Sequence, residues 1–162
     1  MLATLPVRLA YEPKMEPHLA SPPVDRTRLH IMILDDEDDY HLITRMMLKK
    51  AGFQGRLSAY MEPKEAMDHL LDPDDQPDLL FVDINMPATN GFQFLEACCK
   101  HTLIHPEKTM VIMCSSSNRP VDMEMARGVG CVHEYIEKPL TAEQFLRFAA
   151  EQAQRGNALP TP

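Results

Sequence analysis

Apolar residues along the chain fall into two alternating patterns, short continuous runs and longer stretches with helical spacing. A strand that is covered on both faces has a continuous apolar run, because neither of its sides meets water. The runs therefore predict buried strands. Five are expected, at residues 29–34, 56–60, 79–82, 110–114 and 134–136.

The stretches between these runs contain pairs of apolar residues about one helical turn apart. Such pairs form one apolar stripe along a helix, and we interpret every stripe as packing against the sheet. The pairs are Leu42-Ile43 with Met46-Met47, Ala66-Met67 with Leu70-Leu71, Phe94-Leu95 with Cys98-Cys99, and Phe145-Leu146 with Phe148-Ala149. The predicted helices span residues 38–50, 63–71, 91–100, 121–127 and 141–153.

Local signals mark several of the predicted helix ends. Asp38 or Asp39 can cap the first helix. Pro63 suits the first turn of the second helix, because that position needs no backbone N–H donor. Thr141 with Gln144 predicts a capping box at the start of the last helix.

Five strand–helix units with buried strands predict an α/β fold, in which helices cover both faces of a parallel sheet. Right-handed crossovers favour a doubly wound arrangement. We expect one domain over residues 28–154. Residues 1–27 are rich in proline and lack periodicity, so a disordered leader is expected there, and residues 155–162 are expected to form a loose tail.

Composition removes several function classes. The chain has 162 residues and a net charge of −8, which argues against a nucleic-acid partner held through its phosphates. No apolar run is long enough for a membrane span, and prolines interrupt the N-terminal stretch that a signal peptide would need. We therefore expect a cytoplasmic protein. The four cysteines lack CxxC spacing, so reduced thiols are expected, and the seven histidines form no convincing metal-ligand cluster.

Polar side chains follow four of the five predicted strands directly. In a doubly wound fold the working site lies beyond the carboxyl ends of the strands. Asp35 and Asp36 follow the first strand, Asp83 the third, Ser115 the fourth and Lys138 the fifth. Three acids, a hydroxyl and an ammonium are therefore expected at one edge of the sheet.

The three acids predict a magnesium site. Asp35, Asp36 and Asp83 would repel one another at short range, and a divalent cation removes that conflict. Mg²⁺ suits the set, because it prefers hard oxygen ligands and commonly takes one or two carboxylates together with phosphate oxygens. Asp38 and Asp39 belong to the same acidic run, but we interpret them as solvated residues at a helix start.

The remaining groups indicate phosphoryl transfer without a nucleotide site. The chain has neither GxGxxG nor GxxxxGK[ST]. Lys138 and Ser115 could neutralise the oxygens of a transferring phosphoryl group together with Mg²⁺, and Asp83 could be the nucleophile. A single lysine or serine is more often a surface or loop residue, so only the whole set supports this interpretation.

Four motifs in order resemble the receiver domain of two-component response regulators, across about residues 28–154. The Asp-x-Asn-Met-Pro stretch followed by Asn-Gly is the most specific of them. The motifs are IMILDDE at 31–37, PDLLFVDINMP at 77–87 with Asn90, Gly91 and Phe92 after it, VIMCSSS at 111–117, and YIEKPL at 135–140.

The resemblance implies a flavodoxin-like (βα)5 fold with strand order 2-1-3-4-5. It also implies that Asp83 accepts a phosphoryl group from a partner's phosphohistidine. Asp36 would bind Mg²⁺ directly and Asp35 through water. Asn85 would supply its backbone carbonyl to the metal, and its side chain would face the site.

The other motif positions correspond to contact and switch residues of the family. Ser115 matches a residue, more often threonine, that bonds the phosphoryl group, and Lys138 matches the lysine that pairs with a phosphoryl oxygen. Three serines in a row leave Ser116 as an alternative to Ser115. Tyr135 matches an aromatic switch, and Pro139 follows Lys138 where the family often has a cis peptide bond.

These correspondences imply a stand-alone signalling protein, not an enzyme beyond its own phosphorylation and autodephosphorylation. A sensor histidine kinase or a phosphotransfer protein is expected to dock on the first helix, near Leu42, Ile43 and Met46. A downstream protein target is expected on the face formed by the fourth helix, the fifth strand and the fifth helix. The Met-rich fourth helix is unusual and leaves the identity of that target open. The sequence does not indicate the oligomeric state.

Two other readings remain at this point. A magnesium-dependent phosphatase of the haloacid dehalogenase kind also uses a strand-end aspartate, but it needs an acid at the position of Asn85. A degenerate receiver, or a flavodoxin-like binder, would keep the fold and never accept phosphate. The intact motif positions favour the receiver over both.

Overall fold

The computed structural model of the chain describes residues 28–116 and 119–158. The expected leader at 1–27 lies outside the described residues, and so does Ser117. The elements follow one another in strict strand–helix alternation. They are β1 (His30–Leu34), α1 (Asp38–Lys50), β2 (Arg56–Tyr60), α2 (Pro63–Leu70), β3 (Leu79–Asp83), α3 (Gly91–Lys100), β4 (Met110–Ser115), α4 (Pro120–Gly128), β5 (Val132–Glu137) and α5 (Ala142–Ala158).

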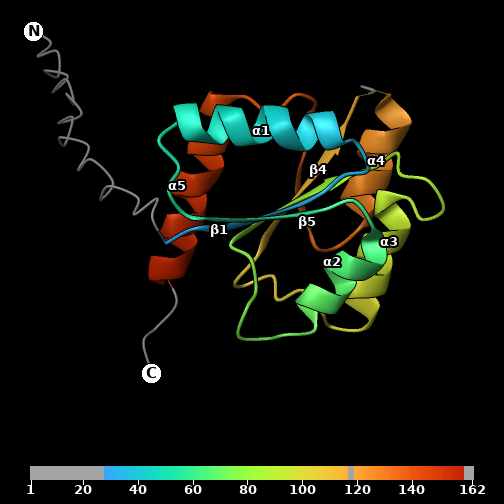
Figure 1. Ribbon diagram of the computed structural model, residues 1–162. Coiled ribbons are helices and arrows are strands. Elements are labelled where there is room, and N and C mark those ends of the chain that lie inside the picture. Colours follow the sequence, from blue (N-terminus) through green and yellow to red (C-terminus); the bar gives the residue numbers. More distant parts are fainter. Residues whose placement is uncertain (1–27, 117–118, 159–162) are drawn as a thin grey trace, which may run out of the picture.

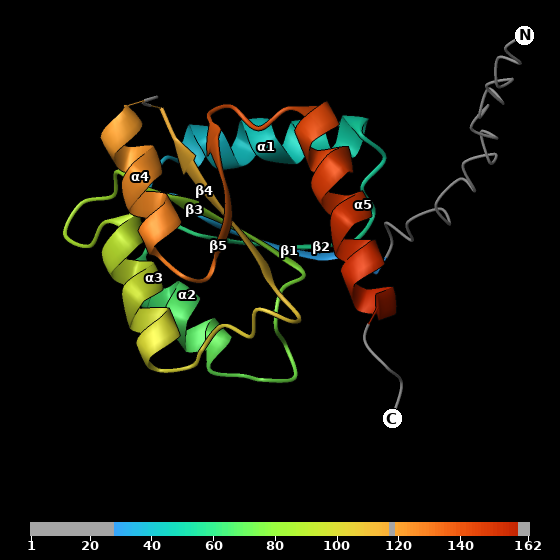
Figure 2. The same ribbon diagram turned by 180° about the vertical axis from the view of Figure 1, so that it is seen from behind.

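The five strands form one parallel sheet in the order β2-β1-β3-β4-β5. Helices α1 and α5 lie on one face of this sheet, and α2, α3 and α4 lie on the other (Figures 1 and 2). The α/β doubly wound fold and its strand order are therefore confirmed. The sheet places the four strand ends that carry the predicted site residues at the same edge.

Alternate residues of each central strand enter two separate cores. Met32 and Leu34 of β1 pack toward α2 and α3, whereas Ile31 and Ile33 pack toward α1 and α5. All four side chains are at most 1% exposed. This double burial is the reason that β1 has a continuous apolar run.

The apolar stripe predicted on α1 is wrong. Leu42, Ile43 and Met46 are 57%, 52% and 60% exposed. The face that packs on the sheet instead carries Tyr40, His41, Thr44 and Leu48. Of the four predicted residues only Met47 packs against this core, where it is partly buried, whereas Phe94, Leu95 and Cys98 of α3 are buried as predicted.

The helix starts differ in how they are capped. Glu37 is the N-cap of α1 and makes no side-chain cap hydrogen bond, so the predicted capping by Asp38 or Asp39 is wrong. The capping box of Thr141 and Gln144 is confirmed by bonds in both directions, at 3.2 and 2.9 Å. A second capping box, formed by Asn90 and Gln93 at the start of α3, was not predicted.

The cysteines also differ from the prediction. Cys99 near the end of α3 and Cys131 just before β5 form a disulfide, which closes a loop of sequence separation 32. Cys98 and Cys114 are free and buried. The expectation of reduced thiols is therefore wrong for the first pair, because α3 lies beside the end of α4 and the loop that follows it, which brings together cysteines that the sequence spacing did not relate.

Candidate functional site

Three neighbouring strands deliver the acidic and hydroxyl groups to one edge of the sheet. Asp83 is the last residue of β3 and pairs in register with Cys114 of β4. The backbone N–H of Asp35 donates to the carbonyl of Tyr60 at 3.0 Å, which extends the ladder just beyond β1. Asp35, Asp83 and Ser115 are at most 3% exposed, so the rigid sheet fixes their positions.

The ammonium of Lys138 joins two of the buried acids. Its Nζ lies 2.6 Å from Oδ2 of Asp35 and 2.9 Å from Oδ1 of Asp83. The Lys138 side chain is only 8% exposed, so this pairing is shielded from solvent. Glu37 adds a longer contact of 3.8 Å from the exposed side. The lysine therefore spans the pocket between the ends of β1 and β3.

The backbone at the end of β5 aims Lys138 into this pocket. The N–H of Lys138 donates to the carbonyl of Ser115 at 2.8 Å. The peptide bond between Lys138 and Pro139 is cis. The ammonium also lies 4.4 Å from the centroid of the Tyr40 ring, where a cation–π contact contributes to holding it.

Burial and charge act against each other in this pocket. Burial raises the pKa of the Asp35 carboxyl, and hydrogen bonds from Lys138 and from the Glu37 backbone N–H offset only part of that effect. Burial would by itself lower the pKa of Lys138, but its bonds to Asp35 and Asp83 together raise it above the ordinary lysine value. Lys138 therefore stays charged at neutral pH.

The acids outnumber the cation that neutralises them. Asp35, Asp36 and Asp83 offer carboxylate oxygens that all lie within 4.8 Å of one another. One lysine leaves an excess of negative charge among these three groups. The donors are all hard oxygens, and Asp36 is partly exposed, which opens the cluster to solvent. This set fits Mg²⁺.

The structure distinguishes between the two candidate serines. Ser115 is fully buried, and its Oγ accepts a hydrogen bond of 3.4 Å from the side-chain amide of Asn85. Ser116 is exposed. Asn85 itself is exposed at the mouth of the pocket, and its amide cannot act as the general acid of a phosphatase.

Tyr135 lies on β5, away from the acids. Its side chain is partly buried and packs against the core cluster that contains Val111 and Met113. It also lines a hollow of about 270 Å³ between α4 and β5, beside Met123 and Ala126. The predicted aromatic switch therefore has open space next to its ring.

Three residues support the site through contacts that were not predicted. The ring Nε2 of His41 bonds the carbonyl of Asp35 at 2.6 Å and is buried. Tyr40 forms the aromatic contact to Lys138. Gly91 touches the backbone of Asp83 so closely that no side chain fits. The sequence signal for His41 is its helical spacing of four residues from Glu37, whose carboxylate contacts Lys138.

Comparison with known proteins identifies the family. Residues 31–150 match the response regulator receiver domain. The chain belongs to this family. The match covers all of the strand-end residues described above, from Asp35 to Lys138.

Relatives and solved structures agree with this assignment. The chain is 29% identical over 118 residues to protein PilG of Pseudomonas aeruginosa, which covers 73% of the chain and 82% of that protein. It is 28% identical to the transcriptional regulatory protein YxdJ of Bacillus subtilis, of which it spans only 50%. A two-component response regulator from Cytophaga hutchinsonii has the same fold, with a TM-score of 0.72, 22% identity and coverage of 78% of this chain and 98% of that one.

The chemotaxis protein CheY4 of Vibrio cholerae also shares the fold, with a TM-score of 0.62, 21% identity and coverage of 74% of this chain and 94% of that one. Within residues 28–116 and 119–158, no helix has the length and apolarity that crossing a membrane requires.

Proposed function

We propose that the protein is a phosphoryl-accepting switch, in which Asp83 takes a phosphoryl group from the phosphohistidine of a sensor kinase or phosphotransfer protein. The observation that carries this proposal is the buried bridge of Lys138 between Asp35 and Asp83. It holds the Asp83 carboxylate at the end of β3, beside the ammonium of Lys138. The partly exposed Asp36 lies on the open side of the same cluster.

The transfer is an in-line displacement at phosphorus. A carboxylate oxygen of Asp83 forms the new O–P bond while the P–N bond to the donor imidazole breaks, and the imidazole keeps the bonding electron pair. Lys138 donates an N–H to one phosphoryl oxygen, and the Ser115 hydroxyl donates to another. Both donors stabilise the charge that these oxygens carry in the transition state.

Mg²⁺ is the proposed cofactor. Asp35, Asp36, Asp83 and the backbone carbonyl of Asn85 would hold it, with Asp35 acting through water. Once bound, the ion would neutralise the acids and the incoming phosphoryl oxygens. The excess of acids over lysine in the pocket supports this assignment.

Output is proposed to pass through α4, β5 and α5. A phosphoryl group on Asp83 competes for Lys138 and draws on the Ser115 hydroxyl, so the end of β4 is displaced toward the site. Tyr135, next to the hollow beneath α4, would then turn inward. A protein target would recognise the resulting surface, which includes the exposed Val121 and Met125 of α4.

The donor is proposed to dock on α1. Leu42, Ile43 and Met46 form an exposed apolar patch on the helix that begins three residues after Asp35. We propose that this receiver domain works in the cytoplasm.

Acetyl phosphate with Mg²⁺ tests the chemistry without any partner. Intact mass should increase by one phosphoryl group in the wild type, and EDTA should abolish the increase. Asp83→Asn should show none, and Asp38→Asn is the matched control, because Asp38 is an exposed acid of the same run and should leave labelling unchanged. Labelling of Asp83→Asn equal to wild type would refute Asp83 as acceptor.

A further inference from the structure

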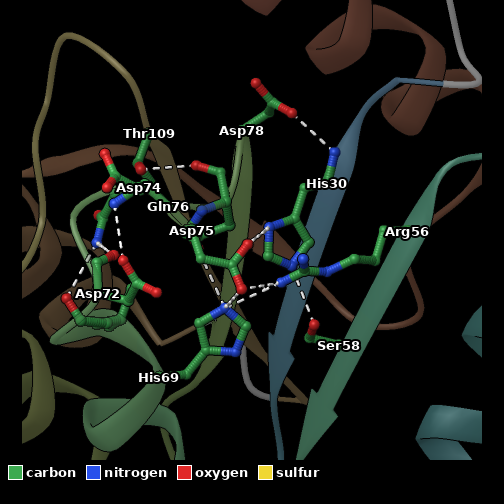
Figure 3. A network of polar contacts seen from close by, with 12 residues as sticks. His30, Arg56, Ser58, His69, Asp72, Asp74, Asp75, Gln76, Asp78 and Thr109 are labelled. Carbon is green, nitrogen blue, oxygen red and sulfur yellow. Dashed lines mark hydrogen bonds and ion pairs between the residues drawn. The ribbon is translucent and has the colours of Figure 1, made fainter.

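A second cluster of metal-ligating side chains lies at the opposite end of the sheet from Asp83. It consists of His30 at the start of β1, His69 on α2 and Asp75 in the loop before β3. Figure 3 shows the two imidazole rings turned toward the Asp75 carboxylate. We name these three residues the histidine cluster. Strand β1 separates it from the phosphoacceptor pocket by about 16 Å, at about 3.3 Å per residue.

Each imidazole of the histidine cluster lies at a distance from the Asp75 carboxylate that approaches the spacing of ligands in a tetrahedral site. Nε2 of His69 lies 3.2 Å from Oδ2 of Asp75, and Nδ1 of His30 lies 3.9 Å from Oδ1 of the same carboxylate. Ligands at the usual Zn²⁺ distances of about 2.0–2.1 Å are about 3.3–3.4 Å apart in a tetrahedron. The contact of His69 with Asp75 is close to this separation, and that of His30 with Asp75 is about half an ångström longer.

In each imidazole, the ring nitrogen that does not face Asp75 lies against a hydroxyl group. Nε2 of His30 lies 3.0 Å from Oγ of Ser58, and Nδ1 of His69 bonds the hydroxyl of Tyr60. If each hydroxyl accepts a hydrogen bond from the ring N–H, the neutral ring carries its lone pair on the other nitrogen. That nitrogen is Nδ1 of His30 or Nε2 of His69, and both face Asp75. Metal-binding histidines have this second contact in most proteins, because it fixes the tautomer and the ring orientation.

The rings are also largely out of bulk water. The side chains of His30 and His69 are 9% and 10% exposed. A metal ion bound between them would be held by ligands whose positions the surrounding protein already fixes.

A positive charge already lies against the histidine cluster. Nη2 of Arg56 is 2.5 Å from Oδ2 of Asp75 and 3.2 Å from Nε2 of His69 (Figure 3). The Arg56 side chain is 51% exposed, so it can turn into solvent when another cation takes its place. Acidic residues of the same loop, Asp72 and Asp74, further favour a cation here.

From this geometry we infer that the histidine cluster is a transition-metal site, with two imidazoles and one carboxylate as ligands and water in the fourth position. The mixed nitrogen and oxygen donors favour Zn²⁺ over Mg²⁺. A bound ion joins β1, α2 and the loop that leads into β3. The inference is independent of phosphoryl transfer at Asp83.

Zinc titration of the full chain tests the site. The protein is first treated with EDTA and then dialysed into Mg²⁺, which fills the acidic pocket, and binding is followed by calorimetry and native mass spectrometry. One equivalent should bind to the wild type at micromolar concentration. His69→Gln and Asp75→Asn should weaken binding at least about 100-fold, and Ser58→Ala about 10–100-fold through loss of the second contact of His30.

Two controls separate a built site from adventitious binding. His101→Gln removes an exposed histidine at the end of α3 and should leave the affinity unchanged. Arg56→Gln should tighten binding several-fold, because it removes the competing cation. Labelling by acetyl phosphate should persist in His69→Gln, which shows that the variant is folded. No zinc binding by the wild type, or equal binding by the wild type and His69→Gln, would overturn the inference.

Discussion

Gly91, the first residue of α3, lies directly against the backbone carbonyl of Asp83. A Cβ at this position would overlap that carbonyl oxygen and crowd Cα of Ile84. The N–H of Gly91 also donates to the carbonyl of Ile84 at 3.0 Å, which folds the β3–α3 loop back onto the end of the strand. The glycine after Asn90 is therefore part of the support that positions the phosphoacceptor.

Gly91→Ala should displace the end of β3. The clash is with backbone, which cannot move aside as a flexible side chain can, so we expect a loss of about 1–3 kcal/mol in the free energy of unfolding. Phosphorylation by acetyl phosphate should also slow, because Asp83 moves. Urea unfolding and intact mass measure the two effects. Gly128→Ala in α4 is the control, since a Cβ there meets nothing within 4 Å; equal stability of the two variants would contradict the argument.

Lys138→Met should slow phosphorylation of Asp83 and leave the fold intact. The variant keeps the length of the side chain but loses the ammonium that contacts Asp35 and Asp83. Loss of one such electrostatic contact in a transition state costs about 10²–10³ in rate, and we expect that reduction in labelling by acetyl phosphate.

The control for this variant is Lys64→Met, which removes an exposed lysine paired with Asp68 on α2. It should label at the wild-type rate. Mg²⁺ binding by Lys138→Met, followed by calorimetry, should persist or become tighter, because the acids lose their competing cation. A wild-type labelling rate in Lys138→Met would show that the lysine does not contact the phosphoryl group.

Stability should depend on pH through His30. Its pKa is lowered from 6.5 to about 4 in the folded state, so between these values the unfolded chain binds a proton that the folded chain does not. The free energy of unfolding should therefore rise as the pH increases from 4 to 6.5, by about 2–3 kcal/mol from this residue.

Urea unfolding in EDTA across this pH range measures the effect without a metal ion. His30→Gln should lose most of the slope, and His101→Gln should keep it, since His101 is exposed. An unchanged slope in His30→Gln would assign the pH dependence to other groups. Asp35 acts in the opposite direction, because its raised pKa makes the folded state bind the extra proton.

The periodicity of the chain is sufficient to predict an α/β doubly wound fold because the strands are buried on both faces, whereas the strand order was implied by the family resemblance. A continuous run such as Leu79–Asp83 leaves few alternatives to a central parallel strand. The same reasoning fails on α1, where apolar residues such as Leu42 and Ile43 are exposed. Periodicity identifies an apolar face but does not say whether the sheet or another protein covers it.

The candidate site was predictable for a related reason. Parallel strands end at one edge, so residues that follow them must meet there, and Asp35, Asp83 and Lys138 do. The contact of His69 with Asp75 and the pairing of Cys99 with Cys131 depend on how helices and loops pack against the sheet. No local pattern in the sequence encodes such contacts.

The disulfide between Cys99 and Cys131 should be measurable as missing thiols and as stability. In denaturant without reductant, only Cys98 and Cys114 should react with a thiol reagent, and all four cysteines should react after reduction. Closure of a loop of sequence separation 32 should stabilise the fold by about 3–4 kcal/mol, mainly by restricting the unfolded chain.

Urea unfolding with and without reductant should show this difference in the free energy of unfolding of the wild type. Cys131→Ser should unfold at the same urea concentration under both conditions. Four reactive thiols in unreduced wild type would mean that the pair is reduced, as the absence of CxxC spacing suggested.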